Sequence, residues 1–127
     1  MRVFLTRVFV RFARKERLDE QRLCEAVTRA ERGAIDADLG GGLIKHRVAR
    51  PGAGRSGGTR AVIAYRLAAR SVFLYGFAKS ERDNIDDREL ADLKKLAKLF
   101  LSLTDEQIAA AVRATELQEI VYDEQEE

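Results

Sequence analysis

The chain has 127 residues, with 23 basic and 21 acidic side chains, a net charge of +2 at pH 7 and 46% hydrophobic residues. This is the size of one ordinary domain with enough apolar residues to bury a core. We expect a single domain over 1–122 and a disordered acidic tail at 123–127. The apolar stretches are far shorter than the roughly 20 residues of a membrane span, and the N-terminus lacks a secretory pattern. The sequence therefore predicts a cytoplasmic protein that does not enter a membrane.

The charges are distributed unevenly along the chain. Between Leu43 and Arg82, nine basic residues accompany a single acidic residue, Glu81, so the remainder of the chain is net acidic. A segregated basic segment of this kind favours an anionic partner.

The first third of the chain predicts a strand and two helices. A short strand is expected at 2–5, followed by a helix over 6–15 with apolar residues at helical spacing. Asp19 has the character of a helix cap, and Gly33 is suited to end that second helix in a left-handed turn. Three successive glycines within 36–42 predict a turn into extended chain.

Three strands are expected next, at 43–49, 59–67 and 71–79. Short connections join neighbouring strands, and such connections produce antiparallel pairs. The sequence therefore predicts a three-stranded antiparallel meander.

Two helices and a strand complete the pattern. Asp86 with Glu89, and Thr104 with Gln107, have the spacing of capping boxes, so a helix is expected over 86–99 and a shorter one from 104. A further edge strand is expected at 117–122. The mixture predicts an α+β fold.

The lone cysteine and the lone histidine have interpretations as packed residues. Cys24 lies in a helical apolar pattern, which favours a small buried residue over a nucleophile. His46 alternates with Lys45 and therefore sides with apolar neighbours, which favours a structural role over that of a general acid or base. No metal-ligand cluster is present, so neither a metal nor a small-molecule cofactor is expected.

Basic side chains are expected on one face of the meander, because side chains alternate along a strand. The glycine-rich 50–58 loop adds Arg50, Arg55 and bare backbone amides that let an anion approach. It lacks the Gly-Lys-Ser/Thr ending of a nucleotide triphosphate site. The alternative interpretation is a flexible hairpin loop whose arginines keep it soluble. The residues that share faces are Lys45 and Arg47 in the first strand, Arg60 and Arg66 in the second, and Tyr75, Phe77 and Lys79 in the third.

The basic segment contains no paired carboxylates and no Ser-His-Asp order, so conventional hydrolase chemistry is disfavoured. A ribonuclease works without them if cations stabilise the transition state while the RNA 2′-hydroxyl attacks the adjacent phosphate. Arginine makes paired hydrogen bonds to phosphate oxygens, and a lysine among other cations is suited to accept a proton. A solvated basic surface is the alternative interpretation.

Two blocks of sequence resemble a known family. Residues 42–60 (GLIKHRVARPGAGRSGGTR) and 73–85 (FLYGFAKSERDNI), with the helix that follows, closely resemble RelE-like toxins of bacterial type II toxin–antitoxin modules. The likeness extends upstream through 23–27 and 36–40 and indicates a HigB-like branch of the RelE/ParE superfamily.

The resemblance implies a RelE-like fold, with N-terminal helices packed on a small, mainly antiparallel sheet and with C-terminal helices. It also implies a toxin that acts as a metal-independent endoribonuclease, an mRNA interferase that cleaves ribosome-bound message and inhibits translation. The partners implied are mRNA, the ribosome and a cognate antitoxin that is a small helix-turn-helix protein. A non-catalytic ParE-like toxin that inhibits gyrase, and a plain RNA-binding module, are the alternatives.

Site residues follow from the same resemblance. We expect Lys45 or Lys79 as the proton acceptor, Arg60 and Arg82 as clamps on the transition state, and Tyr75 as an orienting residue. The family commonly has lysine where this chain has His46 and Arg55. The expected RNA-binding residues are Arg47, Arg50, Arg55 and Arg66.

Overall fold

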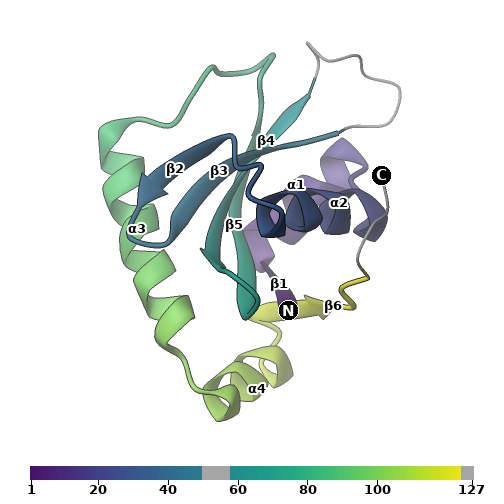
Figure 1. Ribbon diagram of the computed structural model, residues 1–127, viewed down its shortest axis with the longest axis vertical. Coiled ribbons are helices and arrows are strands. Elements are labelled where there is room, and N and C mark those ends of the chain that lie inside the picture. The colour runs from purple at the N-terminus through teal and green to yellow at the C-terminus, as the bar shows by residue number, and fades with distance from the viewer. Residues whose placement is uncertain (50–57, 124–127) are drawn as a thin grey trace.

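The computed structural model describes residues 1–49 and 58–123. One six-stranded sheet has the strand order β2-β3-β4-β5-β1-β6, with helices on both of its faces (Figure 1). This arrangement confirms the expected α+β fold. The elements in chain order are β1 (Arg2–Thr6), α1 (Arg7–Glu16), α2 (Glu20–Glu31), β2 (Ala37–Gly40), β3 (Leu43–Val48), β4 (Thr59–Arg66), β5 (Arg70–Ala78), α3 (Asp87–Ser102), α4 (Asp105–Arg113) and β6 (Leu117–Ile120).

The centre of the sheet is the predicted meander, since β3 pairs antiparallel with β4 and β4 with β5. The N-terminal strand β1 then lies parallel to β5, and β6 closes the far edge antiparallel to β1. The chain thus returns its first and last strands to neighbouring positions.

The prediction for 36–42 was wrong in one respect. Ala37–Gly40 forms the short edge strand β2, which pairs with β3, and only Gly41 and Gly42 make the turn. Both glycines have positive φ values, of 65° and 82°, which residues that carry a side chain rarely adopt. A methyl group on Gly42 would also lie 2.7 Å from the Leu101 side chain, so this turn packs closely against α3.

The predicted helix ends are confirmed. Thr6 and Asp19 accept hydrogen bonds from backbone amides in the first turns of α1 and α2, and Gly33 takes the left-handed conformation after α2. Both capping boxes are present, at Asp86 before α3 and at Thr104 before α4. These contacts satisfy amide groups that a helix leaves without partners.

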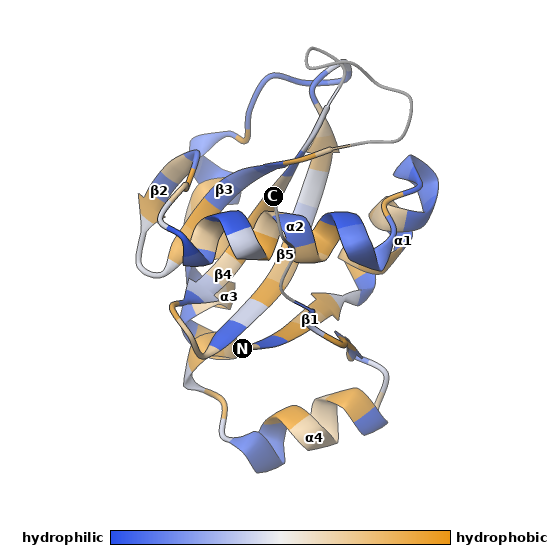
Figure 2. Cartoon of the chain, turned by 45° about the vertical axis from the view of Figure 1, so that its right-hand side comes forward, coloured by the Kyte–Doolittle hydropathy of each residue, from blue (hydrophilic) through white to orange (hydrophobic). Residues whose placement is uncertain are grey.

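Two apolar cores hold the layers together. Helices α1 and α2 bury Phe9, Leu23 and Val27 against one face of the sheet, while α3 and α4 bury Ala97 and Ile108 on the other. Figure 2 shows hydrophobic residues along the strands and alternating hydropathy along α2, as an amphipathic helix requires.

Close contact between α1 and β5 depends on a glycine. A methyl group at Gly76 would lie 2.3 Å from ring carbons of Phe12, so only glycine lets this ring rest on the strand. Phe9, one turn earlier, packs against Phe73 with ring centroids 4.9 Å apart. The N-terminal helix is therefore seated directly on the central strands.

The C-terminal end is shorter in strand structure than expected, because β6 stops at Ile120. Tyr122 follows β6 and lies against α2, where its hydroxyl oxygen is 2.8 Å from that of Thr28. Apart from Asp123, the predicted acidic tail lies outside the described residues. None of the helices within 1–49 and 58–123 combines the length and hydrophobicity of a membrane span.

Candidate functional site

Strand register brings the predicted cations of β3 and β4 together. Arg47 pairs with Arg60, and Arg60 pairs in turn with Phe77 of β5. One row further along, Lys45 pairs with Val62, which pairs with Tyr75. Directly paired residues in adjacent strands project to the same side, so these side chains share the face that α3 covers elsewhere. We call Lys45, Arg47, Arg60, Tyr75 and Arg82 the basic face.

Helix α3 leaves the basic face open. Its apolar residues Leu93, Ala97 and Leu101 pack with Leu43 and Ala64, towards the opposite end of β3 and β4. The strands therefore bury their apolar ends under the helix and present their basic ends to solvent. Along the basic end, Lys45 and Arg60 are half-buried and Arg47 is exposed.

Arg82 is held in place by Glu89. The two guanidinium nitrogens lie 2.5 Å and 3.0 Å from the two carboxylate oxygens, which is the paired geometry that arginine favours. The hydrogen bond from Arg82, followed by the one from the Asp86 backbone, lowers the pKa of Glu89 to about 2. One of these two nitrogens, Nη1, also donates a hydrogen bond to the Tyr75 hydroxyl at 3.4 Å. Arg82 is thus oriented towards β5.

Asn84 connects Lys45 to Arg82. Its side-chain oxygen accepts from the Lys45 ammonium at 3.1 Å, and its backbone oxygen accepts from Arg82 at 2.9 Å. No sequence pattern indicated that Asn84 would bind Lys45 or that Glu89 would pair with Arg82. The capping box identified Glu89 only as a helix start, and no spacing signal marks a loop asparagine as a contact of a strand lysine.

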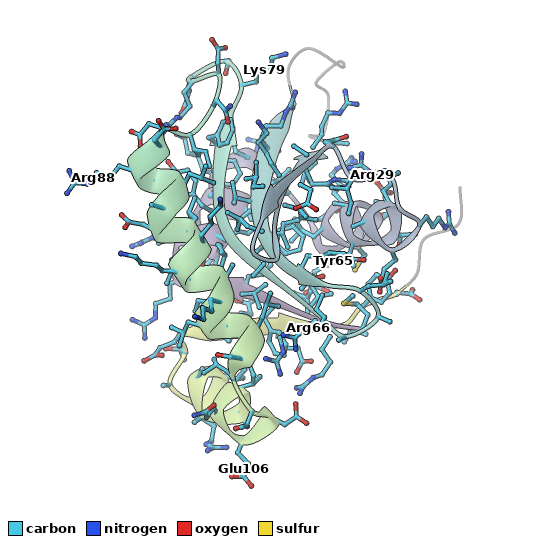
Figure 3. The ribbon with its side chains drawn as sticks, turned by 60° about the vertical axis from the view of Figure 1, so that its left-hand side comes forward. Arg29, Tyr65, Arg66, Lys79, Arg88 and Glu106 are labelled. Carbon is cyan, nitrogen blue, oxygen red and sulfur yellow. The ribbon has the colours of Figure 1, made fainter. Side chains whose placement is uncertain are left out.

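The structure describes two further predicted site residues, Lys79 and Arg66, and they lie at opposite ends of the sheet. Lys79 follows β5 at the open end, where its backbone amide donates to Gly58 at 3.3 Å. Arg66 lies at the opposite end of β4, as Figure 3 shows by comparison with Lys79, so the structure does not bring it to the basic face. Arg50 and Arg55 lie outside the described residues. Glu81, the acid of this segment, pairs with Lys15 of α1 at 3.3 Å.

His46 and Cys24 are both buried on the α2 side of the sheet, as their sequence pattern predicted. Burial, with the positive charge of Arg29, lowers the pKa of His46 to about 4, so the imidazole is neutral near pH 7. Its Nδ1 accepts from the Asp36 backbone amide at 3.4 Å. Burial also raises the pKa of the Cys24 thiol. Neither group faces the basic surface, and both have the packed placement that the sequence favoured.

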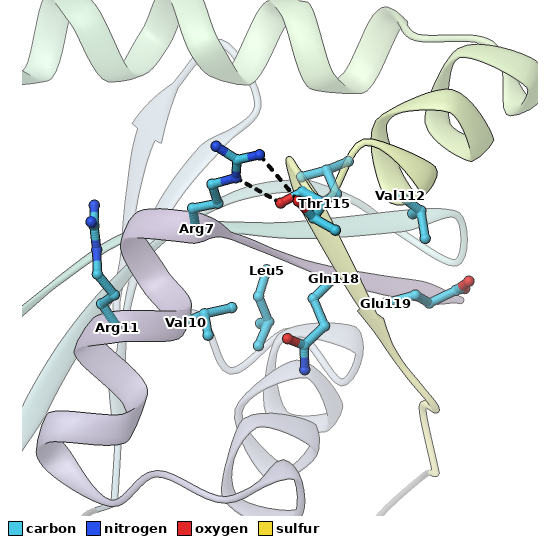
Figure 4. Close-up of a pocket in the computed structure, with 9 residues that line it drawn as sticks. Leu5, Arg7, Val10, Arg11, Val112, Thr115, Gln118 and Glu119 are labelled. Carbon is cyan, nitrogen blue, oxygen red and sulfur yellow. Dashed lines mark hydrogen bonds between the residues drawn. The ribbon is translucent and has the colours of Figure 1, made fainter.

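No group of three or more His, Cys, Asp or Glu side chains able to hold a metal ion occurs among the described residues. A cavity of about 520 Å³ lies elsewhere, between α1, α4 and β6 (Figure 4). Leu5, Val10 and Leu117 contribute to its lining, and Arg7 at its edge donates to the backbone oxygen of Thr115 at 2.8 Å. None of the basic-face residues lines this cavity.

Taken together, the open end of the sheet can bind anions and orient them. It offers four cations from β3, β4 and the segment after β5, one of them fixed by a carboxylate and one by an amide oxygen. A phenol lies within reach of the fixed guanidinium. Such a surface suits a phosphodiester, whose oxygens accept several charged hydrogen bonds at once.

Comparison with known proteins supplies the family. No curated protein matches the chain. The profile of the family described as the RelE toxin of the RelE/RelB toxin–antitoxin system matches residues 1–120, which include every strand and helix of the structure. The match supports an antitoxin as a partner. The chain therefore belongs to the family of RelE toxins of toxin–antitoxin systems.

Proposed function

We propose that this toxin is a metal-independent endoribonuclease that cleaves messenger RNA. The observation that carries the proposal is the convergence of Lys45, Arg47, Arg60 and Arg82 on one open face of the sheet. A polyanion bound there meets cations from three segments of the chain, namely β3, β4 and the segment after β5. In the cytoplasm, ribosome-bound message is the substrate we assign to it.

The reaction needs charge stabilisation more than it needs a metal. The RNA 2′-oxygen attacks the adjacent phosphorus, the bond from phosphorus to the 5′-oxygen breaks, and a 2′,3′-cyclic phosphate and a 5′-hydroxyl result. Negative charge accumulates on the phosphoryl oxygens during this step, and fixed cations lower its energy. Arg60 and Arg82 are the clamps in this proposal, with Arg47 holding a neighbouring phosphate.

Two lysines are candidates for the proton transfers. In neutral form, Lys45 or Lys79 accepts the proton of the 2′-hydroxyl, and the other lysine, charged, protonates the departing 5′-oxygen. Lys45 has the more defined position, because Asn84 holds its ammonium group at 3.1 Å. Tyr75 orients the substrate through its hydroxyl, which receives a hydrogen bond from Arg82.

The antitoxin in this proposal is a small helix-turn-helix protein. Arg50 and Arg55 remain predicted phosphate contacts.

The test compares Arg60→Ala with Arg88→Ala after induction in cells. Arg88 is exposed on α3 and points away from the sheet in Figure 3, so its loss controls for charge. Wild type and the control should produce message fragments with 5′-hydroxyl and 2′,3′-cyclic phosphate ends, and Arg60→Ala should cleave roughly 10²–10³-fold more slowly. Circular dichroism and thermal unfolding should show that all three proteins fold.

Full toxicity of a well-expressed Arg60→Ala protein would contradict the proposal. So would toxicity of the wild type that depends on gyrase and produces DNA damage without cleaved message. Binding of RNA without new ends would reduce the protein to an RNA-binding module.

A further inference from the structure

A second basic surface lies at the end of the sheet opposite the basic face. It is a groove of about 550 Å³ between β4, α3 and the β2–β3 turn. No carboxylate is among the described residues that line it. We call it the distal groove, and its lining residues are Gly41, Arg66, Lys94, Lys95, Lys98, Leu101 and Ser102.

The four cations of the distal groove are exposed and come from two elements. Lys94 and Lys98 are one helical turn apart on α3 and lie beside Arg66 of β4. The ion pairs among the described residues involve other basic groups, and none of these four cations has a carboxylate of a described residue within 4.0 Å. Their charge is therefore available to an external anion.

The glycine turn brings bare backbone into the same groove. Gly40 and Gly41 have positive φ values, and a methyl group at Gly40 would lie only 3.8 Å from the Lys94 ammonium. At Gly41 a methyl group would meet nothing within 4 Å, so the backbone there is open to the groove. Side-chain-free backbone beside lysines allows a phosphate to approach closely.

The groove and the basic face lie on one side of the sheet. Arg60 and Arg66 belong to the same strand and alternate to the same face, and six residues of strand span about 20 Å. Figure 3 shows Arg66 near the lower part of α3 and Lys79 at the other end of the sheet. A single RNA strand held at the basic face can therefore reach the groove within several nucleotides.

We propose that the distal groove binds the sugar-phosphate backbone of the RNA that flanks the cleavage site. This inference rests on the proposed nuclease function. The lining favours a nucleic acid over a protein partner, because it offers compact ammonium charges on flexible stems. Leu101 is its one large apolar residue among the described lining, whereas protein interfaces depend on buried aromatic or apolar anchors.

The experiment measures binding of 2′-O-methyl RNA, which resists 2′-hydroxyl attack. Wild type, Lys94→Gln/Lys98→Gln and the charge-matched control Arg88→Gln/Arg113→Gln are titrated with a long oligonucleotide and with a short one confined to the cleavage site. Loss of two phosphate contacts should lower the slope of log affinity against log salt by about 1.4 for the long oligonucleotide. Extrapolated from 1 M to 0.1 M salt, this difference in slope corresponds to about 25-fold weaker binding by the lysine variant.

The control should bind both oligonucleotides as wild type does, and the lysine variant should bind the short one normally. Equal affinity of wild type and the lysine variant for the long oligonucleotide would overturn the inference, and so would an equal loss in the control. Cleavage of unmodified message bound to ribosomes is measured in parallel with the same three proteins. Absence of cleavage by the wild type would count against the nuclease. Normal cleavage, together with unchanged binding of the long oligonucleotide by the lysine variant, would refute only the proposed role of the distal groove.

Discussion

The buried imidazole of His46 makes the stability of the fold depend on pH. The side chain is fully buried, and its pKa falls from the ordinary 6.5 to about 4 because burial and the nearby Arg29 disfavour the charged form. Asp36, 3.8 Å away, opposes this only in part. Between these two pH values the unfolded chain binds a proton that the folded chain does not. The stability that the neutral imidazole contributes is therefore fully present above pH 6.5, and it is lost as the pH falls towards 4.

The size of the loss follows from the two pKa values. Each tenfold difference in proton affinity is worth about 1.4 kcal/mol, so the full effect is about 3 kcal/mol near pH 4 and about 2 kcal/mol at pH 5. Against a total of about 5–15 kcal/mol for a domain, this is readily measured.

The assay is urea unfolding of wild type and His46→Gln at pH 7 and pH 5. Carboxylates titrate in both proteins, so the difference between them isolates the histidine. Wild type should lose about 2 kcal/mol more than the variant on acidification. Equal losses would refute the reasoning. Should the variant fail to fold, the wild-type imidazole can be titrated by NMR, and a midpoint near 6.5 would refute it equally.

Three further outcomes are expected. Glu89→Gln keeps an acceptor for the capping box but removes the charge that orients its arginine partner, so kcat for RNA cleavage should fall roughly tenfold with KM unchanged, and the same fall in Asp92→Asn would discount orientation. Phe9→Ala should cost about 3–5 kcal/mol in urea unfolding, because the ring is fully buried, and a loss below about 1 kcal/mol would contradict that packing. Gly76→Ala should cost about 1–3 kcal/mol through overlap with Phe12, and unchanged stability would show that the ring moves aside.

Local signals predicted most of the elements. Caps such as Asp19 and Asp86 act within one helical turn, and the meander strands have short connections, so neither depends on distant residues. The parallel pairing of β1 with β5 has no such signal, because their partners are Arg2 and Arg70, far apart in sequence. Strand β2 was missed for the same reason: four residues ending in glycine become a strand only beside β3.

The candidate site shows the same division between local and distant information. Alternation predicted that Lys45 shares a face with Arg47, and Arg60 with Arg66, and the pairing of β3 with β4 puts Lys45, Arg47 and Arg60 on one face. It also grouped Arg66 with them, because alternation specifies the side of a sheet but not the position along a strand. Contacts made by Asn84 depend on the path of the segment after β5, which no residue pattern specifies.

The place of β1 has a consequence for how the toxin is made. The first strand of the sheet in chain order is an interior strand, flanked by β5 on one side and by β6, the last strand of the sheet in chain order, on the other. During translation, β1 waits for partners about 70 and then 115 residues downstream, and such distant pairing is slow. Until residues 117–120 have left the ribosome, β1 therefore lacks its second partner, so the toxin fold is complete only when nearly the whole of the segment that matches the family has been made.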